Sequence, residues 1–187
     1  MEQHKKGLPP WIKRMIIPLI AVGFVVGLVM SIIPWHMITR SPNSAAQTFL
    51  QQLSTAEVAF SVDHKAFVVG VTANDINELI AYGLRPDSHV GFVILPQLAA
   101  SNSNTPGFIA FAAHRAKGSI LFIYDYPNGD GVQPATAASY GGVARPEKLT
   151  LFRFNNGVLE SSGSAQFGLK NGKVNAPLGD FTWTPVK

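Results

Sequence analysis

The sequence predicts an α+β protein in which an N-terminal transmembrane helix is followed by a long helix packed on an antiparallel β-sheet. Three observations support this fold class. Residues 15–37 form an apolar segment without charge, apolar residues then recur at helical spacing, and short apolar runs separated by turn residues follow. We therefore expect a cytoplasmic leader at 1–14, a transmembrane helix at 15–38 and an extracytoplasmic domain at 39–187.

The predicted membrane span rests on its length and its flanks. Its uninterrupted apolar part, Ile16 to Ile33, would cover about 27 Å as a helix, which is close to the hydrocarbon thickness of a bilayer. Basic residues outnumber the single acid, Glu2, before the span, which predicts a cytoplasmic N-terminus. The predicted interfacial anchors are Trp11, Lys13, Arg14 and Trp35.

A cleaved signal peptide is the alternative interpretation of the same segment. The apolar run is longer than the usual core of such peptides, about 7 to 15 residues, and residues 33–36 offer no small-residue cleavage site. We therefore expect an uncleaved anchor. This places the chain in the bacterial inner membrane as a single-pass protein, with its C-terminal domain in the periplasm or outside the cell.

The charge of the chain is concentrated in the leader. Of the formal net charge of +4, +3 comes from residues 1–14, where four bases accompany one acid. The remainder is nearly neutral and contains no Lys/Arg run or zinc spacing, so we expect no nucleic-acid partner. The chain has no cysteine, which excludes disulfides and thiol chemistry.

Two helices are predicted after the span. Ser41 and Pro42 form a helix start, and Ser44 with Gln47 offers a second possible cap. Apolar residues then recur at spacings of four, three and four to about Val62, and we expect them to pack on a sheet formed by residues 89–124: Phe49, Leu53, Ala56 and Phe60. A shorter helix follows, capped by Thr72 and Asp75 and closed by Gly83.

The rest of the chain predicts antiparallel strands. The first runs are 89–95, 108–113 and 120–124, separated by turn residues. Asn156-Gly157 and Asn171-Gly172 are typical of tight hairpin turns and join 149–154 to 158–161 and 165–169 to 173–175. A last strand is expected at 181–184. The irregular stretches 97–106 and 126–146 are expected to be surface loops.

Three stretches follow the span in a familiar order: AAQTFLQQLSTAEVAFSVDHKAF, INELIAYGLRPDSHVGFVI and GFIAFAAHRAKGSILFIYDYPNGDG. Their order and residue types resemble the globular half of type IV pilins and type II secretion pseudopilins. In that family the helix ends in an Ala-Gln/Glu-x-Ala-aromatic pattern followed by Phe-Ala, and residues 56–60 and Ala66-Phe67 occupy those places. The resemblance covers roughly residues 44–131 and implies a pilin-like domain.

The filament-forming motif of that family is missing. Prepilins resemble each other most at a Gly followed by Phe-Thr-Leu-Ile-Glu, where a peptidase cuts, whereas Gly7 here precedes Leu-Pro-Pro-Trp-Ile and the span contains no Glu. Pro34 and Pro42 also separate the span from the next helix, although a pilin generally runs the two as one. We expect a pilin-like domain on an uncleaved anchor, with no cut after Gly7.

One face of the span carries small residues at a spacing of four: Gly23, Gly27 and Ser31. This arrangement is typical of closely packed transmembrane helices, and it predicts packing against a membrane partner or a second copy. Glycine is also common in spans generally, so the alternative is that the spacing has no function.

No motif predicts catalysis, a cofactor or a metal site. The histidines are scattered without ligand spacing: His4, His36, His64, His89 and His114. The loop 125–131 fits a turn better than a calcium loop, because Tyr126 would occupy the first ligand position. Asp75 and Glu78 lie one helical turn apart, where capping and solvation explain them.

The sequence therefore predicts a non-catalytic, single-pass membrane protein that serves as a structural or accessory subunit of an envelope membrane assembly through its pilin-like domain. An atypical minor pilin or pseudopilin, of a type IV pilus filament or a type II secretion system, is the first alternative. A ligand-binding or enzymatic domain whose site lies in the loops 97–106 and 126–146 is the second. The predicted partners are the membrane and other membrane-protein subunits, or a second copy through the span.

Overall fold

The computed structural model describes residues 41–97, 107–139, 146–163, 166–176 and 178–186. The chain divides into two compact units, Met1–Thr39 and Arg40–Lys187, and all the described residues belong to the second. Its elements are α2 (Pro42–His64), α3 (Ala73–Ala81), β1 (Val90–Pro96), β2 (Phe108–His114), β3 (Phe122–Tyr126), β4 (Gln133–Pro134), η2 (Pro146–Lys148), β5 (Phe152–Asn155), β6 (Val158–Ser161), β7 (Gly168–Lys170), β8 (Lys173–Asn175), η3 (Leu178–Asp180) and β9 (Thr184–Pro185).

Both helices begin at the caps that the sequence predicts. The Ser41 hydroxyl accepts the Ser44 N–H at 3.1 Å, and Pro42 follows the cap, so α2 starts there. It ends at Lys65, whose φ of 56° is left-handed. At the start of α3, Thr72 and Asp75 exchange hydrogen bonds of 2.7 and 3.2 Å in a capping box.

Seven strands form one antiparallel sheet in the order β4-β3-β2-β1-β5-β6-β9, and β7 and β8 form a separate hairpin. The two predicted tight turns are present. Asn156 and Gly157 have φ values of 49° and 79°, and Asn171 and Gly172 have 52° and 73°. Positive φ at both central residues is what a two-residue hairpin with the right-handed strand twist requires.

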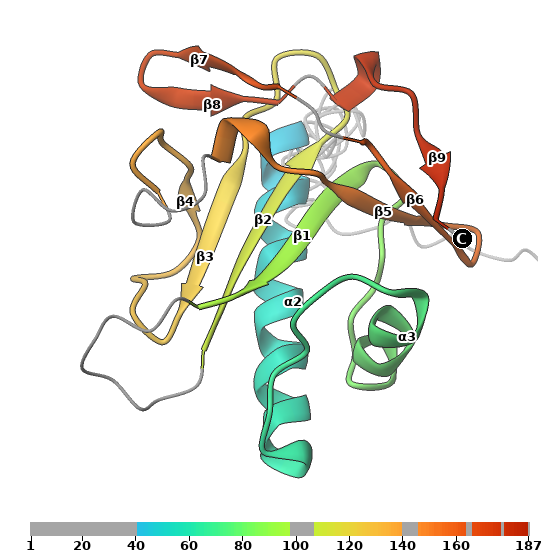
Figure 1. Cartoon of the computed structure of the whole chain (residues 1–187). Coiled ribbons are helices and arrows are strands. Elements are labelled where there is room, and N and C mark those ends of the chain that lie inside the picture. Colours follow the sequence, from blue (N-terminus) through green and yellow to red (C-terminus); the bar gives the residue numbers. More distant parts are fainter. Residues whose placement is uncertain (1–40, 98–106, 140–145, 164–165, 177, 187) are drawn as a thin grey trace, which may run out of the picture. The chain divides into compact units, whose positions relative to one another are not determined.

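The central strands are buried on both faces of the sheet. On one face, Phe92, Phe108 and the residues at every second position from them pack against α2. On the opposite face, Val93, Phe111 and their neighbours form a second cluster. Figure 1 shows α2 running along β1–β3, with α3 beside its C-terminal half and the β7–β8 hairpin near the end where α2 begins. The domain therefore has three layers, with the sheet in the middle.

Both edges of the seven-stranded sheet contain proline. The Ala135 N–H donates to Leu121 O and the Val186 N–H to Leu159 O, each at 2.9 Å, so these amides point into the sheet. Successive residues of a strand alternate in direction, which places Pro134 of β4 and Pro185 of β9 at outward positions. Because proline has no N–H, neither residue offers a donor to the outside.

The structure corrects the predicted fold class. Instead of one long helix on a sheet, the described residues form two helices of 23 and nine residues with a seven-stranded antiparallel sheet. Two features explain the difference: the point at which α2 ends and the burial of the central strands. The left-handed Lys65 ends α2, and the continuous apolar runs of β1 and β2 are buried on both faces, so the sheet needs a second covering layer.

The predicted single-pass membrane protein, its place in the bacterial inner membrane and its assignment to pilus or secretion machinery are corrected as well. Within the described ranges no helix is both long and apolar enough to cross a bilayer. The outer side of α2 carries polar side chains such as Gln51 and Thr55, and α3 covers only about 14 Å. The predicted span, residues 15–38, lies outside the described residues.

Candidate docking surface

The outer side of α2 presents a continuous row of side chains to solvent. Its members recur at spacings of four and three, as along one side of a helix, and we call them the α2 face: Ser44, Thr48, Gln51, Thr55, Val58 and Val62. Gln51, Thr55 and Val62 are exposed and the others half-buried. This is the spacing with which one helix packs along another.

The α2 face carries no charge. From Pro42 to Val62 the only ionisable residue of the helix is Glu57, and it is fully buried on the opposite side. The residues that flank the row are also small or uncharged: Ala45, Gln47, Gln52, Ala59 and Ser61. A partner can therefore cover this side of α2 without removing any charge from water, which is the usual cost of burying a helix surface.

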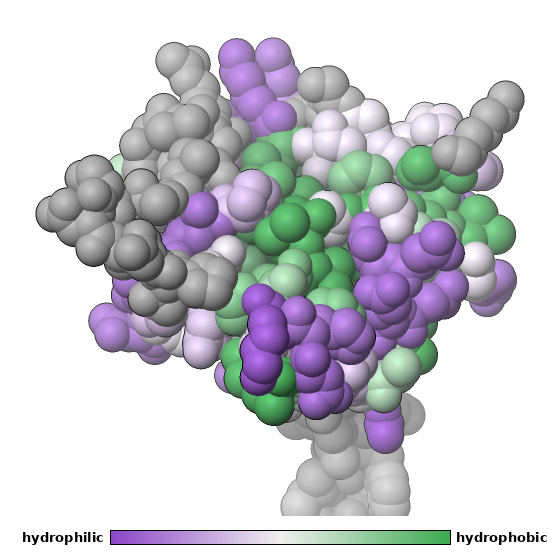
Figure 2. Space-filling view, turned by 60° about the horizontal axis from the view of Figure 1, so that its bottom comes forward, coloured by the Kyte–Doolittle hydropathy of each residue, from purple (hydrophilic) through white to green (hydrophobic). Residues whose placement is uncertain are grey.

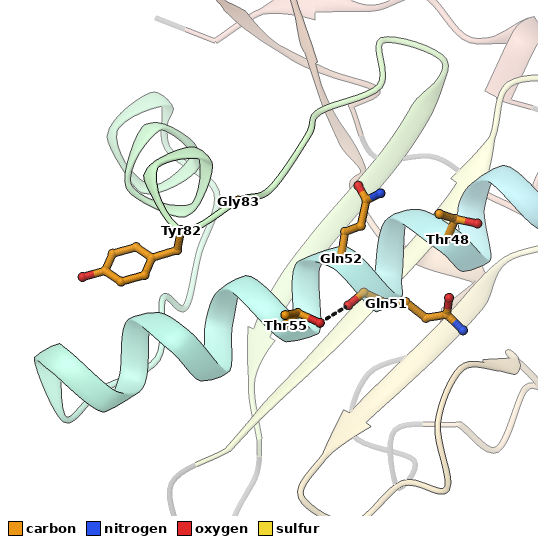
Figure 3. Close-up of a pocket in the computed structure, with 6 residues that line it drawn as sticks. All are labelled: Thr48, Gln51, Gln52, Thr55, Tyr82 and Gly83. Atoms are coloured by element: carbon orange, nitrogen blue, oxygen red, sulfur yellow. Dashed lines mark hydrogen bonds between the residues drawn. The ribbon is translucent and has the colours of Figure 1, made fainter.

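A groove of about 300 Å³ lies beside the α2 face. Four α2 residues form one wall and the end of α3 forms the other, as Figure 3 shows: Thr48, Gln51, Gln52 and Thr55, with Tyr82 and Gly83. The Thr55 hydroxyl is already used, since it donates to the Gln51 carbonyl at 2.9 Å. The two glutamine amides can both donate and accept hydrogen bonds. This lining suits an uncharged polar or apolar ligand surface.

Tyr82 is held in place by contacts on two sides. Its hydroxyl donates to Asp63 Oδ2 at 2.8 Å, and this hydrogen bond, with the nearby charge, raises the pKa of Tyr82 above its usual value. Its ring meets Phe60 edge-on at 5.5 Å between centroids, and Phe60 stacks on His64 at 4.0 Å. The groove wall is therefore formed in the free domain.

Gly83 turns the chain away at the end of α3. The Leu84 N–H donates to Leu79 O and the Gly83 N–H to Ile80 O, both at 3.0 Å, which is the pattern of a Schellman motif. The φ of 99° at Gly83 strongly favours glycine. The turn predicted from sequence therefore sets the position of Tyr82 and of the groove.

Hydrophobic side chains are exposed near the end of this surface. Figure 2, which brings the lower end of Figure 1 forward, shows hydrophobic residues gathered between hydrophilic clusters. Three large apolar side chains of α2, α3 and the connection between them are exposed: Val62, Val69 and Ile80. Within the α2 face itself, the apolar residues Val58 and Val62 stand at the C-terminal end.

Outside this surface, the fold brings together two histidines that are far apart in the sequence, His89 and His114. The rings of His89 and His114 stack with centroids 5.9 Å apart, and Asp87 Oδ1 lies 3.1 Å from His89 Nδ1. The Ala116 N–H donates to His114 Nδ1 at 3.0 Å, which leaves the proton of the neutral ring on Nε2. The signal available in the sequence was their position at the facing ends of two consecutive predicted strands.

The described residues contain no group of three or more His, Cys, Asp and Glu side chains that could hold a metal ion. Asp125 lies near the end of β3 and begins the segment, 125–131, that resembles a calcium loop in sequence. It accepts a hydrogen bond from Gln97 Nε2 at 2.8 Å, and burial raises its pKa. A carboxylate engaged in this way supports the fold of the loop. Asp75 caps α3, and Glu78 is exposed.

The residues singled out from sequence fall into two groups. Those of the proposed span and its anchors lie outside the described residues and stay predictions: Trp11, Lys13, Arg14, Gly23, Gly27, Ser31 and Trp35. Phe49, Leu53, Ala56 and Phe60 are buried in the cluster between α2 and the sheet. Parts of the two candidate ligand loops, 98–106 and 140–145, also lie outside the described residues.

The apolar periodicity of α2 indicates only its buried side and does not reveal the α2 face. An outer helix side free of charge over 21 residues was visible in the sequence. Comparisons with protein-family models, with curated proteins and with solved structures find no match to this chain.

Proposed function

We propose that this domain is a non-catalytic interaction subunit that binds a helix of another protein along the α2 face and the groove beside Tyr82. The observation that carries the proposal is the combination of helix-packing spacing and the complete absence of charged side chains along the α2 face, from Ser44 to Val62. Ordinary solvent-facing helix sides carry charged residues, because these keep the surface hydrated.

The lining defines the partner. Small and β-branched side chains such as Ala59 and Val58 allow a second helix to approach closely, and Gln51 and Gln52 can pair with polar groups of either kind. The partner helix should therefore expose small, apolar or amide side chains and no charge. This fits a structural or accessory subunit of an assembly better than an enzyme.

The test is site-specific crosslinking in the native host. A photoreactive amino acid at Thr55, in the centre of the α2 face, should give a defined adduct with another protein, whereas the same group at the exposed Asn77 of α3 should not. Adding Thr48→Glu should remove the adduct, since it places a charge in the interface; we expect a loss of affinity of at least about 100-fold, or about 2.8 kcal/mol. Circular dichroism should show unchanged folding.

Three results would count against the proposal. Equal adducts from positions 55 and 77 would mean that the contact is not specific to the α2 face. An adduct with α2 of another copy of this chain would show that the partner is a second copy and not a different protein. An adduct unaffected by Thr48→Glu would show that the face tolerates charge and is not buried by the partner.

A further inference from the structure

Glu57 is an ionisable group inside the packed side of α2. It is fully buried, and its Oε2 accepts the Val68 N–H at 2.9 Å. Its Oε1 has no hydrogen-bond partner in the part of the chain that the structure describes. A buried carboxyl oxygen without a donor is costly when neutral and far more costly when charged.

The residue that Glu57 holds belongs to the connection between α2 and α3, residues 65–72, which we call the strap. The strap is also attached by the Gly70 N–H, which donates to Ile94 O at 3.2 Å, and by Phe67, whose ring lies 5.3 Å from that of Phe108. Of these three attachments, the one at Val68 depends on a group that can gain or lose a proton.

The surroundings of Glu57 favour its neutral form. Burial raises its pKa to about 8, the Val68 N–H opposes this rise, and the charge of Asp75 on α3 adds to it. On α2 itself, Asp63 and His64 are exposed, and the strap's Lys65 donates to the Val62 carbonyl at 2.8 Å. The sheet residues packed in this cluster are apolar, for example Phe92 and Ile94.

We propose that the Glu57 carboxyl is a proton-dependent latch for the strap. With its proton on Oε1, the group stays buried while Oε2 accepts the Val68 N–H. When the proton leaves, the charge on Oε1 needs hydrogen bonds that the closed structure does not supply. Lifting the strap admits water to Oε1 and breaks the Val68 contact, so proton loss and strap opening occur together.

The sign of the pH effect follows from the two states. In the open state Glu57 has its ordinary pKa of 4.5, and in the closed state about 8. The closed state is therefore fully favoured below pH 4.5, and that advantage is lost as the pH rises towards 8. Because one proton is released, the opening equilibrium should increase by up to about tenfold for each pH unit between these limits.

Amide hydrogen exchange on the full chain, followed by NMR from pH 5 to 8, tests the latch. After correction for intrinsic exchange, protection of the Val68 and Gly70 amides should fall by up to about tenfold per pH unit. Protection of Ala110 and Ala112 in the central strand β2 should fall less. In Glu57→Gln, which keeps an acceptor for Val68, the pH dependence should disappear; in Glu78→Gln, on the exposed side of α3, it should remain.

Two outcomes of the exchange experiment would overturn the latch. Protection at Val68 that does not depend on pH would show that Glu57 does not control the strap. An equal fall at Val68 and Ala110 would assign the proton to global unfolding. If Glu57→Gln does not fold, the ¹³C shift of the wild-type Glu57 carboxyl decides, because a midpoint near the ordinary 4.5 rather than about 8 contradicts the proposal.

Discussion

The two faces of the sheet are covered in different ways. On one face a 23-residue helix packs its side chains against the strands, with Phe49 and Phe92 rings 4.9 Å apart. On the other, short segments attach by backbone hydrogen bonds: the Leu121 N–H donates to Val174 O, and the Val174 N–H to Ala135 O, at 2.9 and 3.0 Å. A helix satisfies its own backbone, whereas three-residue strands must use the backbone of the sheet.

The two covering layers are therefore held to the sheet by different interactions. The helix layer depends on the volume and shape of large side chains, so truncation should weaken it most. The layer on the other face, which we call the hairpin layer, consists of the β7–β8 hairpin, η3 with Leu178 and the chain up to Trp183. It depends on the close approach of its backbone and of Leu178 to the sheet, so added volume beneath it should weaken it instead. Substitutions on either side can test this division.

The largest effect is expected on the helix-covered face. Phe49→Ala should lower the free energy of unfolding by about 3 to 5 kcal/mol, because a buried aromatic ring is lost and leaves a cavity. Urea denaturation measures it, with Gln51→Ala on the exposed side of the same helix as the control, where little change is expected. A loss below about 1 kcal/mol in Phe49→Ala would contradict side-chain packing as the main support of this layer.

An intermediate effect is expected from adding a methyl group under the hairpin layer. In Gly91→Ala the new Cβ would lie 2.8 Å from Leu178 Cδ1 and 2.9 Å from the Trp183 ring, so these groups must move. We expect a loss of about 1 to 3 kcal/mol in the free energy of unfolding. Gly168→Ala is the matched control, since its Cβ would have no neighbour within 4 Å. Equal stability of the two variants would show that this layer adapts freely.

The smallest effect concerns the end of the helix-covered face, where His114 follows Ala112 on the same side of β2. Desolvation lowers the pKa of His114 below 6.5, so folding favours the neutral ring. Stability from this source is complete above pH 6.5 and is lost as the pH falls towards the lowered value. Because the buried Glu57 acts equally in both proteins, the stability of His114→Gln relative to wild type, measured by denaturation, should rise as the pH falls from 7.5 to 5, with His64→Gln as the control. Parallel stability profiles for His114→Gln and wild type would contradict this prediction.

Local signals in the sequence predicted local structure well. The caps at Ser41 and Thr72 and the turns at Asn156 and Asn171 were predicted and are present, because each depends on residues only a few positions apart. The predicted fold class was wrong because it depends on contacts between segments that are far apart in the sequence. The unbroken apolar runs of β1 and β2 indicate burial on both faces, but they do not identify the segment that covers the second face.

The covering segment itself gives no periodic signal. Its buried residues are isolated in short polar stretches: Phe167, Val174, Ala176 and Leu178. Each strand of its hairpin has three residues, too few to show alternation. The candidate site was equally hard to predict, since the groove requires the position of Tyr82 next to Thr55, which only tertiary packing determines.

The prolines at the two edges of the sheet limit how copies of this domain can associate. Strand addition needs outward N–H groups to continue the hydrogen-bond ladder, and Pro134 and Pro185 remove one at each edge. Copies brought to high concentration therefore lack a ready route to growth by sheet extension. Strand addition at the edges of the seven-stranded sheet is therefore disfavoured, which leaves side-chain surfaces as the better route to contacts with other proteins and lowers the tendency of these two edges to seed fibres.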